Sequence, residues 1–505
     1  MAVATTSQLA ADAAAEVADC GGNAVDCAVA ASMLSANTEP GVCALAGGAY
    51  VTVWHPDKEP ITIDGNVAVP GIEAGARHDP DRGLAVQMEY GGGVRTVIGG
   101  ASIAVPGTLA ALEKASQTFG NVNWKDTLQP AIRAAADGFP LSEACHYYLG
   151  YSAAPIFSRS ADGFKSLHDN NGSLLESGAC VVIPHLADSL AAIAAEGARL
   201  FYEGDLAARI ADHVRAAGGT LTRTDLASYE AIVRPALSVG SNGWRIATNP
   251  PPAVGGAMLA AMLQGFADEP IKSWNQEAIA HLVRVQLAAL SYRKNKLDLA
   301  DDVGAAANEM LELATNGQLL SRWSSASTVH TSAVDSNGLA CAITASSGYG
   351  SGEMPAGTGL WLNNCLGEME LNRHGLAAGP VGARLPSNMA PGVARQNKTV
   401  LAFGSPGADR ITTALHQFLI NYTQIGCDLD EAVAWPRLHI DVNGERPKLS
   451  HEPGIDLPLV DMNVVPYSST NMYFGGVAAA VFDGADRLQA AADPRREGGT
   501  FVNRG

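Results

Sequence analysis

The chain has 505 residues, of which 47% are hydrophobic and 17% are charged, so it can form one large domain or two ordinary domains with a sizeable core. A formal net charge of −18, with no cluster of Lys and Arg, argues against a nucleic-acid partner, because a phosphate backbone attracts basic surfaces. No window is long and apolar enough to cross a membrane, so no membrane partner is expected either.

The eight cysteines are scattered, without a CxxC pair or a Cys/His spacing typical of metal sites. We therefore expect free thiols, no bound metal and a reducing compartment, with Cys20, Cys27, Cys43 and Cys341 buried in small apolar runs. The first seven residues lack the basic and apolar regions of a secretory signal. The sequence as written thus predicts a cytoplasmic protein, or a periplasmic or secreted one if a signal has been trimmed.

Before residue 300, apolar residues recur mostly at helical spacing. Gly21 and Gly22 are expected to end the first helix, and Pro130 to kink or restart a later one. Strands are expected at 47–54 and 60–64, with further strand material at 233–248. The predicted helices are 6–20, 23–34 (apolar all round and therefore buried), 109–119, 124–137, 189–196, 206–217, 255–268 and 275–295.

The second part of the chain is richer in strands. After a polar, loosely helical stretch at 302–326, segments 328–334 and 339–344 are β-prone, and the pair Asn337-Gly338 between them is a strong hairpin signal. Helices before and between antiparallel strands favour an α+β fold. The remaining predicted elements are strands at 359–362, 399–403, 437–441 and 475–483 and a helix at 411–425.

Thr328 stands at the first position of the first hairpin strand, directly after a small, polar, loop-like segment at 320–327. A Thr at such an edge is often an ordinary β-former. The alternative is a cleavage site between Ser327 and Thr328. Cleavage would leave a hydroxyl and a free α-amine on the same residue, and an amine with a pKa of about 8 is a usable general base for the hydroxyl.

The segment Thr-Val-His-Thr-Ser at 328–332 resembles the start of the small subunit in the γ-glutamyltransferase family of N-terminal-nucleophile hydrolases. The resemblance covers nearly the whole chain. It implies a four-layer αββα sandwich, in which 1–327 is the large-subunit segment and 328–505 the small-subunit segment of one interlaced domain. Other blocks appear in the family's order: Gly-Gly-Asn-Ala-Val-Asp at 21–26 with Ala-Val-Ala-Ala at 28–31, Glu-Pro at 39–40, Gly-Gly at 47–48, Pro-Gly-Thr at 106–108, Asp-Gly-Phe at 137–139, Pro-Pro-Pro at 250–252 with Gly-Gly at 255–256, Gly-Thr-Gly-Leu-Trp-Leu-Asn-Asn at 357–364, Met-Ala-Pro at 389–391, Gly-Ser-Pro-Gly at 404–407 and Ala-Trp-Pro-Arg at 434–437.

The resemblance assigns Thr328 as nucleophile and base. It places Ser346, on the strand paired back toward Thr328, where the family has a Thr that holds the nucleophile; a solvated strand Ser is the other interpretation. The backbone N–H groups of Gly407 and Ala408 match the family's oxyanion donors. Ala408 replaces a second Gly but keeps its N–H. A plain helix N-terminus is the alternative here.

The substrate positions depart from the family pattern. Asn66 stands where the glutamyl enzymes grip the donor α-carboxylate with an Arg, and an Asn cannot supply that charged, bidentate clamp. Among the residues that match the family's binding site for the donor α-amine, only Glu368 keeps a negative charge. The positions matched to substrate binding are Asn66, Asn364, Cys365, Glu368, Ser387 and Asn388.

We therefore expect a self-processing amide hydrolase or acyltransferase that works through an acyl-enzyme on Thr328. Its partners would be a small-molecule amide donor, water or an amine acceptor, and the two fragments of its own precursor. A homodimer with a second copy is left open, and no cofactor is expected. Because the catalytic positions match better than the donor positions, two alternatives stay open. One is an amidase of non-glutamyl acyl specificity, and the other is a non-catalytic, unprocessed relative that binds a small metabolite.

Overall fold

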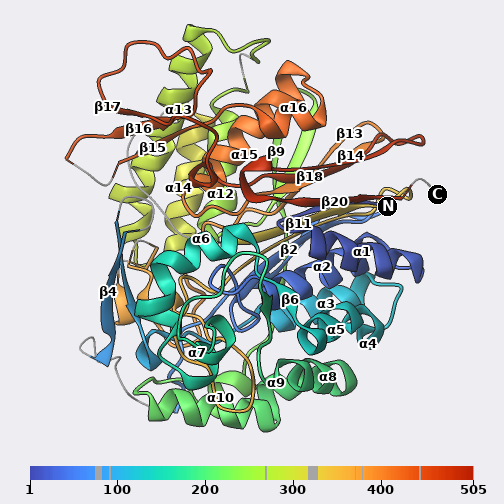
Figure 1. Ribbon diagram of the computed structural model, residues 1–505. Coiled ribbons are helices and arrows are strands. Elements are labelled where there is room, and N and C mark those ends of the chain that lie inside the picture. The colour runs from blue at the N-terminus through green and yellow to red at the C-terminus, as the bar shows by residue number, and fades with distance from the viewer. Residues whose placement is uncertain are drawn as a thin grey trace.

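The computed structural model describes residues 1–73, 82–89, 93–267, 270–316, 328–369, 371–372, 374–377, 379–442 and 445–503. Two antiparallel sheets are stacked face to face in the middle of the molecule, and helices cover the outer side of each sheet (Figure 1). The predicted four-layer αββα sandwich of the α+β class is therefore confirmed.

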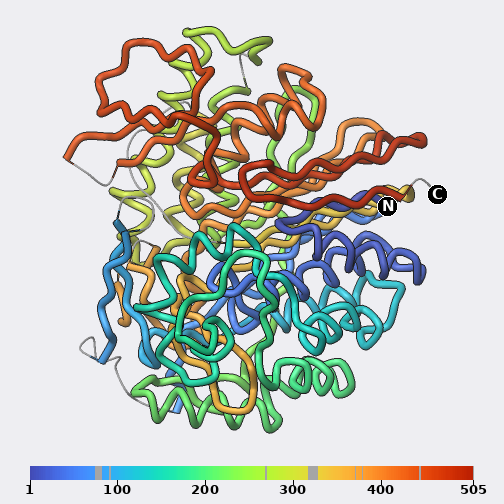
Figure 2. The backbone as a smooth tube through the Cα atoms, viewed as in Figure 1, coloured from blue at the N-terminus to red at the C-terminus, as the bar shows by residue number. Residues whose placement is uncertain are grey.

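The larger sheet contains strands from both sides of residue 328. In order across the sheet these are β20 (Gly499–Val502), β1 (Ala2–Thr5), β11 (Val329–Val334), β12 (Ala340–Ser346), β2 (Gly48–Trp54), β3 (Ile61–Gly65) and β8 (Ile232–Pro235). All neighbours are antiparallel, and the hairpin β11–β12 lies between β1 and β2. Both termini lie at one end of this sheet, where the first and last strands run side by side (Figure 2).

The second sheet is also antiparallel. Its strands, in order, are β19 (Leu488–Ala492), β18 (Ala478–Phe482), β14 (Thr399–Gly404), β13 (Gly392–Gln396), β10 (Trp244–Thr248) and β9 (Leu237–Ser241). Small side chains fill the space between the two sheets; Ala342, Ala402 and Ala480 are fully buried there. Side chains as small as alanine let the two sheets pack closely. A larger side chain between the sheets therefore fits only where the opposite sheet carries a small residue.

The helices form two outer layers. Against the larger sheet lie α1 (Gln8–Asp19), α2 (Ala24–Thr38) and α3 (Thr108–Phe119), and α5 (Gln129–Asp137) packs on α2. Beyond the second sheet lie α12 (Val254–Gln264), α13 (Gln276–Asn295), α14 (Val303–Thr315), α15 (Arg410–Ile420) and α16 (Leu429–Ala434). Every residue of α2 is buried, as its all-round apolar sequence predicts, and Asn23 caps it together with Asp26.

Smaller elements surround these layers. They are the helices α4 (Trp124–Thr127), α6 (Glu143–Ser152), α7 (Ala161–Leu167), α8 (Leu186–Glu196), α9 (Arg199–Glu203), α10 (Asp205–Ala216) and α11 (Arg223–Ala227), and the strands β4 (Leu84–Met88), β5 (Val94–Ile98), β6 (Phe139–Pro140), β7 (Cys180–Val181), β15 (Leu438–Asp441), β16 (Lys448–His451) and β17 (Asn463–Pro466). No helix in the described part of the chain is long and apolar enough to span a lipid bilayer.

Most predicted segments are confirmed to within a few residues, but three details differ. Residues 359–362 form no strand, and only Leu362 makes an isolated bridge, to Ala46. The hairpin loop covers 335–339, one residue more than the predicted 335–338, because Val334 pairs with Ala340; of the predicted Asn337-Gly338 pair only Gly338 has positive φ. All eight cysteines are free, as predicted, but Cys20 is exposed because it ends α1 at the surface.

Candidate active site

Thr328 immediately precedes β11 and is 2% exposed. In the β11–β12 register, Val329 pairs with Ala345 and His330 with Thr344, so the next step places Thr328 opposite Ser346. Alternate residues of a strand share a face, and so Thr328, His330 and Ser346 all point between the two sheets. Ser327 lies outside the described residues, as does the predicted scissile bond.

His330 identifies what this face meets. A Cβ built on Gly404, at the end of β14, would lie 2.1 Å from His330 Cε1, so the ring occupies the space that this glycine leaves. Its Nδ1 lies 2.8 Å from Thr344 Oγ1 and its Nε2 2.8 Å from Ser332 Oγ. Since Ser332 Oγ donates its proton to the carbonyl of Ala478, Nε2 is the ring nitrogen that carries hydrogen and Nδ1 accepts from Thr344. Both ring nitrogens are used, so His330 is a structural group.

Burial lowers the pKa of His330 to about 3, and the ring is neutral at physiological pH. It therefore cannot serve as a general base that titrates near neutrality.

The turn between β14 and α15 forms the second part of the site. Gly407 has φ 119° and Ala408 has φ 69°, both in the region that favours glycine. A Cβ on Gly407 would lie 2.6 Å from Gly475 Cα, so this position also needs glycine for space. Ser405 Oγ accepts the N–H of Gly476 at 3.0 Å, which ties the turn to the same neighbour. Among the described residues, the N–H groups of Gly407 and Ala408 donate no hydrogen bond, so two adjacent donors are unused.

Two of the predicted substrate positions, Asn66 and Asn364, carry side-chain amides that already bond to protein. Asn66 Nδ2 donates to the carbonyl of Leu385 at 2.7 Å. Asn364 Nδ2 donates to Thr96 Oγ1 and to the carbonyl of Val97, and its Oδ1 accepts the N–H of Tyr349. Both side chains therefore hold backbone segments in place.

The acidic position lies next to the end of β12. A Cβ on Gly348 would lie 2.9 Å from Glu368 Oε2 and 2.4 Å from Asn364 Oδ1, so these two side chains converge on the residues that follow Ser346. Cys365 is buried beside them, and burial together with the nearby Glu368 carboxylate raises the pKa of its thiol well above the ordinary value. Cys365 is thus a protonated, inert thiol in the folded protein.

Ser387 and Asn388 lie against the start of α12. The carbonyl of Ser387 accepts the N–H groups of Val254 and Gly255, and Ser387 Oγ accepts the N–H of Met389. Asn388 points into a buried ionic cluster, where it bonds to Arg293 of α13 and to Asp409. Sequence reasoning missed Arg293 and Asp409, because Arg293 reaches Asn388 and Asp409 from a distant part of the chain and no local motif marks these contacts.

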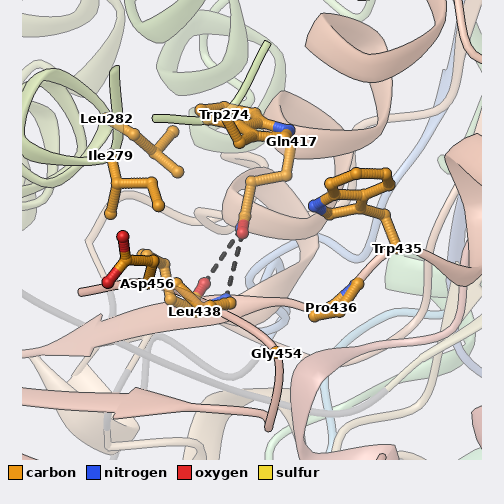
Figure 3. Close-up of a pocket in the computed structure, with 10 residues that line it drawn as sticks. Trp274, Ile279, Leu282, Gln417, Trp435, Pro436, Leu438, Gly454 and Asp456 are labelled. Carbon is orange, nitrogen blue, oxygen red and sulfur yellow. Dashed lines mark hydrogen bonds between the residues drawn. The ribbon is translucent and has the colours of Figure 1, made fainter. Parts of the chain in front are cut away.

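Figure 3 shows a pocket at another place, between α13, α15 and β15. Its walls are mainly apolar, including Trp274 and Trp435, and none of the predicted site residues lines it. Gln417 is fixed there by two hydrogen bonds to the backbone of Leu438, dashed in Figure 3. Nowhere in the described ranges do three or more His, Cys, Asp or Glu side chains gather so that they could hold a metal ion.

The left-handed backbone of Ala408 predicts that Ala408→Gly stabilises the protein. An alanine in this conformation is strained, whereas glycine adopts it freely, so the free energy of unfolding should rise by about 1 kcal/mol. Urea denaturation measures this. Ala414→Gly, within α15, is the matched control and should lower the free energy of unfolding by a similar amount. A lower free energy of unfolding for Ala408→Gly than for the wild type would contradict the strained geometry.

The buried neutral ring of His330 predicts a pH-dependent term in stability. Its pKa in the unfolded chain is about 6.5, above the value of about 3 in the folded protein, so the unfolded state binds more protons between those values. The free energy of unfolding should therefore fall as the pH drops from about 6.5 to about 3. In His330→Gln, which lacks the titrating ring, the free energy of unfolding should fall less steeply over the same range. Denaturant midpoints across that range test this, and parallel curves for the two proteins would refute it.

Comparison with known proteins gives a consistent result. The family model described as Gamma-glutamyltranspeptidase matches residues 10–502. A glutathione hydrolase proenzyme of Escherichia coli is 28% identical over 462 residues, which cover 83% of this chain and 77% of that protein. The capsule biosynthesis protein CapD proenzyme of Bacillus anthracis is 27% identical over 494 residues, 95% of this chain and 86% of that one. The structure of a cephalosporin acylase from Bacillus halodurans superposes with a TM-score of 0.84 at 22% identity, covering 100% of this chain and 96% of that chain. The chain therefore belongs to the γ-glutamyltranspeptidase family.

Proposed function

We propose that the chain cleaves itself between Ser327 and Thr328, and that Thr328 then acts as the N-terminal nucleophile of an amide hydrolase or acyltransferase. As a family member, the protein is a γ-glutamyltranspeptidase-type hydrolase or transferase. One observation carries the finer assignment. The strand register puts Thr328 opposite Ser346 at the end of β11, on the face that meets β14, and β14 leads into the turn with two unused N–H donors.

The proposed reaction starts when Thr328 Oγ1 attacks the carbonyl carbon of the donor amide. The α-amine of the same residue takes the hydroxyl proton, and the N–H groups of Gly407 and Ala408 bind the oxygen that becomes negative. The C–N bond then breaks, and the leaving amine receives the proton from the α-ammonium group. Water or an amine attacks the resulting ester in the same way and releases the acyl group, which restores Thr328.

Self-cleavage begins with the same attack on the chain itself, before the α-amine exists as a base. Thr328 Oγ1 attacks the carbonyl carbon of Ser327, and its proton passes to the Thr328 nitrogen as the C–N bond breaks, so that an ester replaces the peptide bond and the α-amine becomes free. Water then hydrolyses the ester and restores the hydroxyl. The segments 1–327 and 328–505 would stay together, because β11 and β12 are hydrogen-bonded to β1 and β2. Cleavage thus makes the active residue without dividing the fold.

The cleavage proposal predicts two fragments on a denaturing gel. Dividing the 52.1 kDa chain at Thr328 gives pieces of roughly 34 and 18 kDa, and Thr328→Ala should remain whole because it has no hydroxyl to attack the peptide bond. Thr328→Ser, which keeps the hydroxyl, is the control and should still split. Freshly purified wild-type protein that stays at full length and does not turn over an activated amide would refute the proposal.

For the acyl group, we propose a γ-glutamyl-type donor that is held mainly by its amine. Curated relatives carry the name glutathione hydrolase, which supports a γ-glutamyl amide as the first donor to test. Glu368 keeps a carboxylate near Ser346, whereas Asn66 offers no positive charge and its amide nitrogen is bound to Leu385. The donor's carboxylate should therefore matter less than its amine.

Three anilide substrates test whether the donor's amine contributes more than its carboxylate. Relative to the γ-glutamyl anilide, the 4-aminobutyryl anilide lacks only the carboxylate and should keep kcat/KM within about threefold. The glutaryl anilide lacks only the amine and should lose on the order of ten- to hundredfold, the usual effect of removing a charge-assisted hydrogen bond. Glu368→Gln should remove this discrimination. A preference for the glutaryl anilide would instead favour an amidase of non-glutamyl specificity.

A further inference from the structure

Arg293, near the end of α13, is the centre of a buried ionic cluster beside the oxyanion turn. Its side chain is 2% exposed. Nε donates to Asp298 Oδ1 at 3.0 Å, Nη1 donates to Asn388 Oδ1 at 2.5 Å, and Nη1 lies 4.0 Å from Asp409 Oδ1. Asp409 is the residue directly after Ala408. The guanidinium thus connects a helix of the 1–327 segment to the turn in the 328–505 segment.

Asn388 completes this connection with both ends of its amide. Its Oδ1 accepts from Arg293, and its Nδ2 donates to Asp409 Oδ1 at 3.3 Å. The orientation of the amide is unambiguous, because a guanidinium can only donate and a carboxylate accepts. A serine at this position would have one proton and a shorter side chain and would not bridge both groups in this way.

Stability alone explains this cluster poorly. A buried ion pair contributes little net free energy, because removing both charges from water costs about as much as their attraction returns. In addition, Arg293 Nη2 has no hydrogen-bond partner in the part of the chain that the structure describes, and a buried unpartnered donor is unfavourable. A buried arginine kept at this cost points to a role in the geometry of the site.

The turn needs such support because Ala408 is held in the left-handed region. An alanine released from this conformation would relax, and its N–H would rotate away from the developing oxyanion. The hole works only if its donors point at that oxygen, with little tolerance for displacement. Fixing the Asp409 carboxylate opposes the rotation at the adjacent residue.

We propose that Arg293 is a positioning residue for the oxyanion hole: through Asn388 and Asp409 it holds the N–H of Ala408 in its active direction without touching the substrate. This inference rests on the proposed function. It also requires that the two segments remain associated after cleavage, since the arginine and the turn lie on opposite sides of residue 328.

The test begins with Arg293→Met, which has a similar length but neither charge nor donors. We expect kcat to fall on the order of ten- to hundredfold while KM changes by less than about threefold, because the oxyanion interaction forms only in the transition state. The kcat of Arg293→Lys should lie between those of the wild type and Arg293→Met, since a single ammonium group keeps the charge but cannot reproduce the two-pronged donor geometry of the guanidinium. The number of active sites is counted by burst acylation, so that misfolded protein does not enter kcat.

A double-variant cycle separates positioning from a merely structural role. Arg293→Met combined with Asp409→Asn should lower kcat no further than the more severe single variant, because both changes break the same connection. Arg495→Met is the matched control: Arg495 is buried and paired with Glu452 and Asp493, but has no contact with Asn388 or Asp409. Its folded fraction should keep the wild-type kcat.

Several results would overturn the inference. Unchanged kcat in Arg293→Met, losses of log kcat that add in the double variant, or a rise in KM at constant kcat would each do so, the last by making Arg293 a substrate contact. If Arg293→Met fails to fold, Asn388→Ser breaks the bridge without removing a buried charge and should show the same loss of kcat. A wild type that neither splits nor turns over amides refutes the proposed function, whereas an active wild type with an equally active Arg293→Met refutes only the positioning role.

Discussion

The pairing of β11 with β12 is the constraint on which the site depends. It sets which residues face the second sheet, and a shift of one residue would turn Thr328 and His330 away from it. Tertiary packing enforces this register, because His330 fits only where β14 presents Gly404 and where Thr344 and Ser332 complete its hydrogen bonds. A structural histidine therefore fixes the position of Thr328, two residues earlier.

The turn after β14 depends on contacts from several directions. Gly475 packs against Gly407, Ser405 binds the N–H of Gly476, and Arg410 donates to the carbonyl of Tyr473. Together with the cluster around Asp409, these contacts hold two consecutive residues at positive φ. These contacts thus keep Ala408 in its strained backbone conformation, which a surface turn with fewer contacts would not do.

The sequence predicted the fold where local patterns are strong, such as the hairpin at Asn337-Gly338 and the all-apolar α2. It did not predict β1 or β20, because these short strands have no turn signal between them and pair across almost the whole chain. The wrong strand at 359–362 contains apolar residues that pack into the core from a loop. In the site, Gly407 and Ala408 could be found from a motif, whereas the Arg293 cluster depends on three-dimensional contacts that no spacing reveals.

The antiparallel arrangement of β1, β11 and β20 also places the first and last strands of the chain away from Thr328. Ala2 pairs with Val334 and with Val502, at the far end of β11 from Thr328. Six residues of strand span about 20 Å, so Ala2 and Val502 lie well away from Thr328. An affinity tag, a surface linker or a fused partner attached beyond these two strands would therefore be held away from Thr328, which suits the protein to immobilisation on a support.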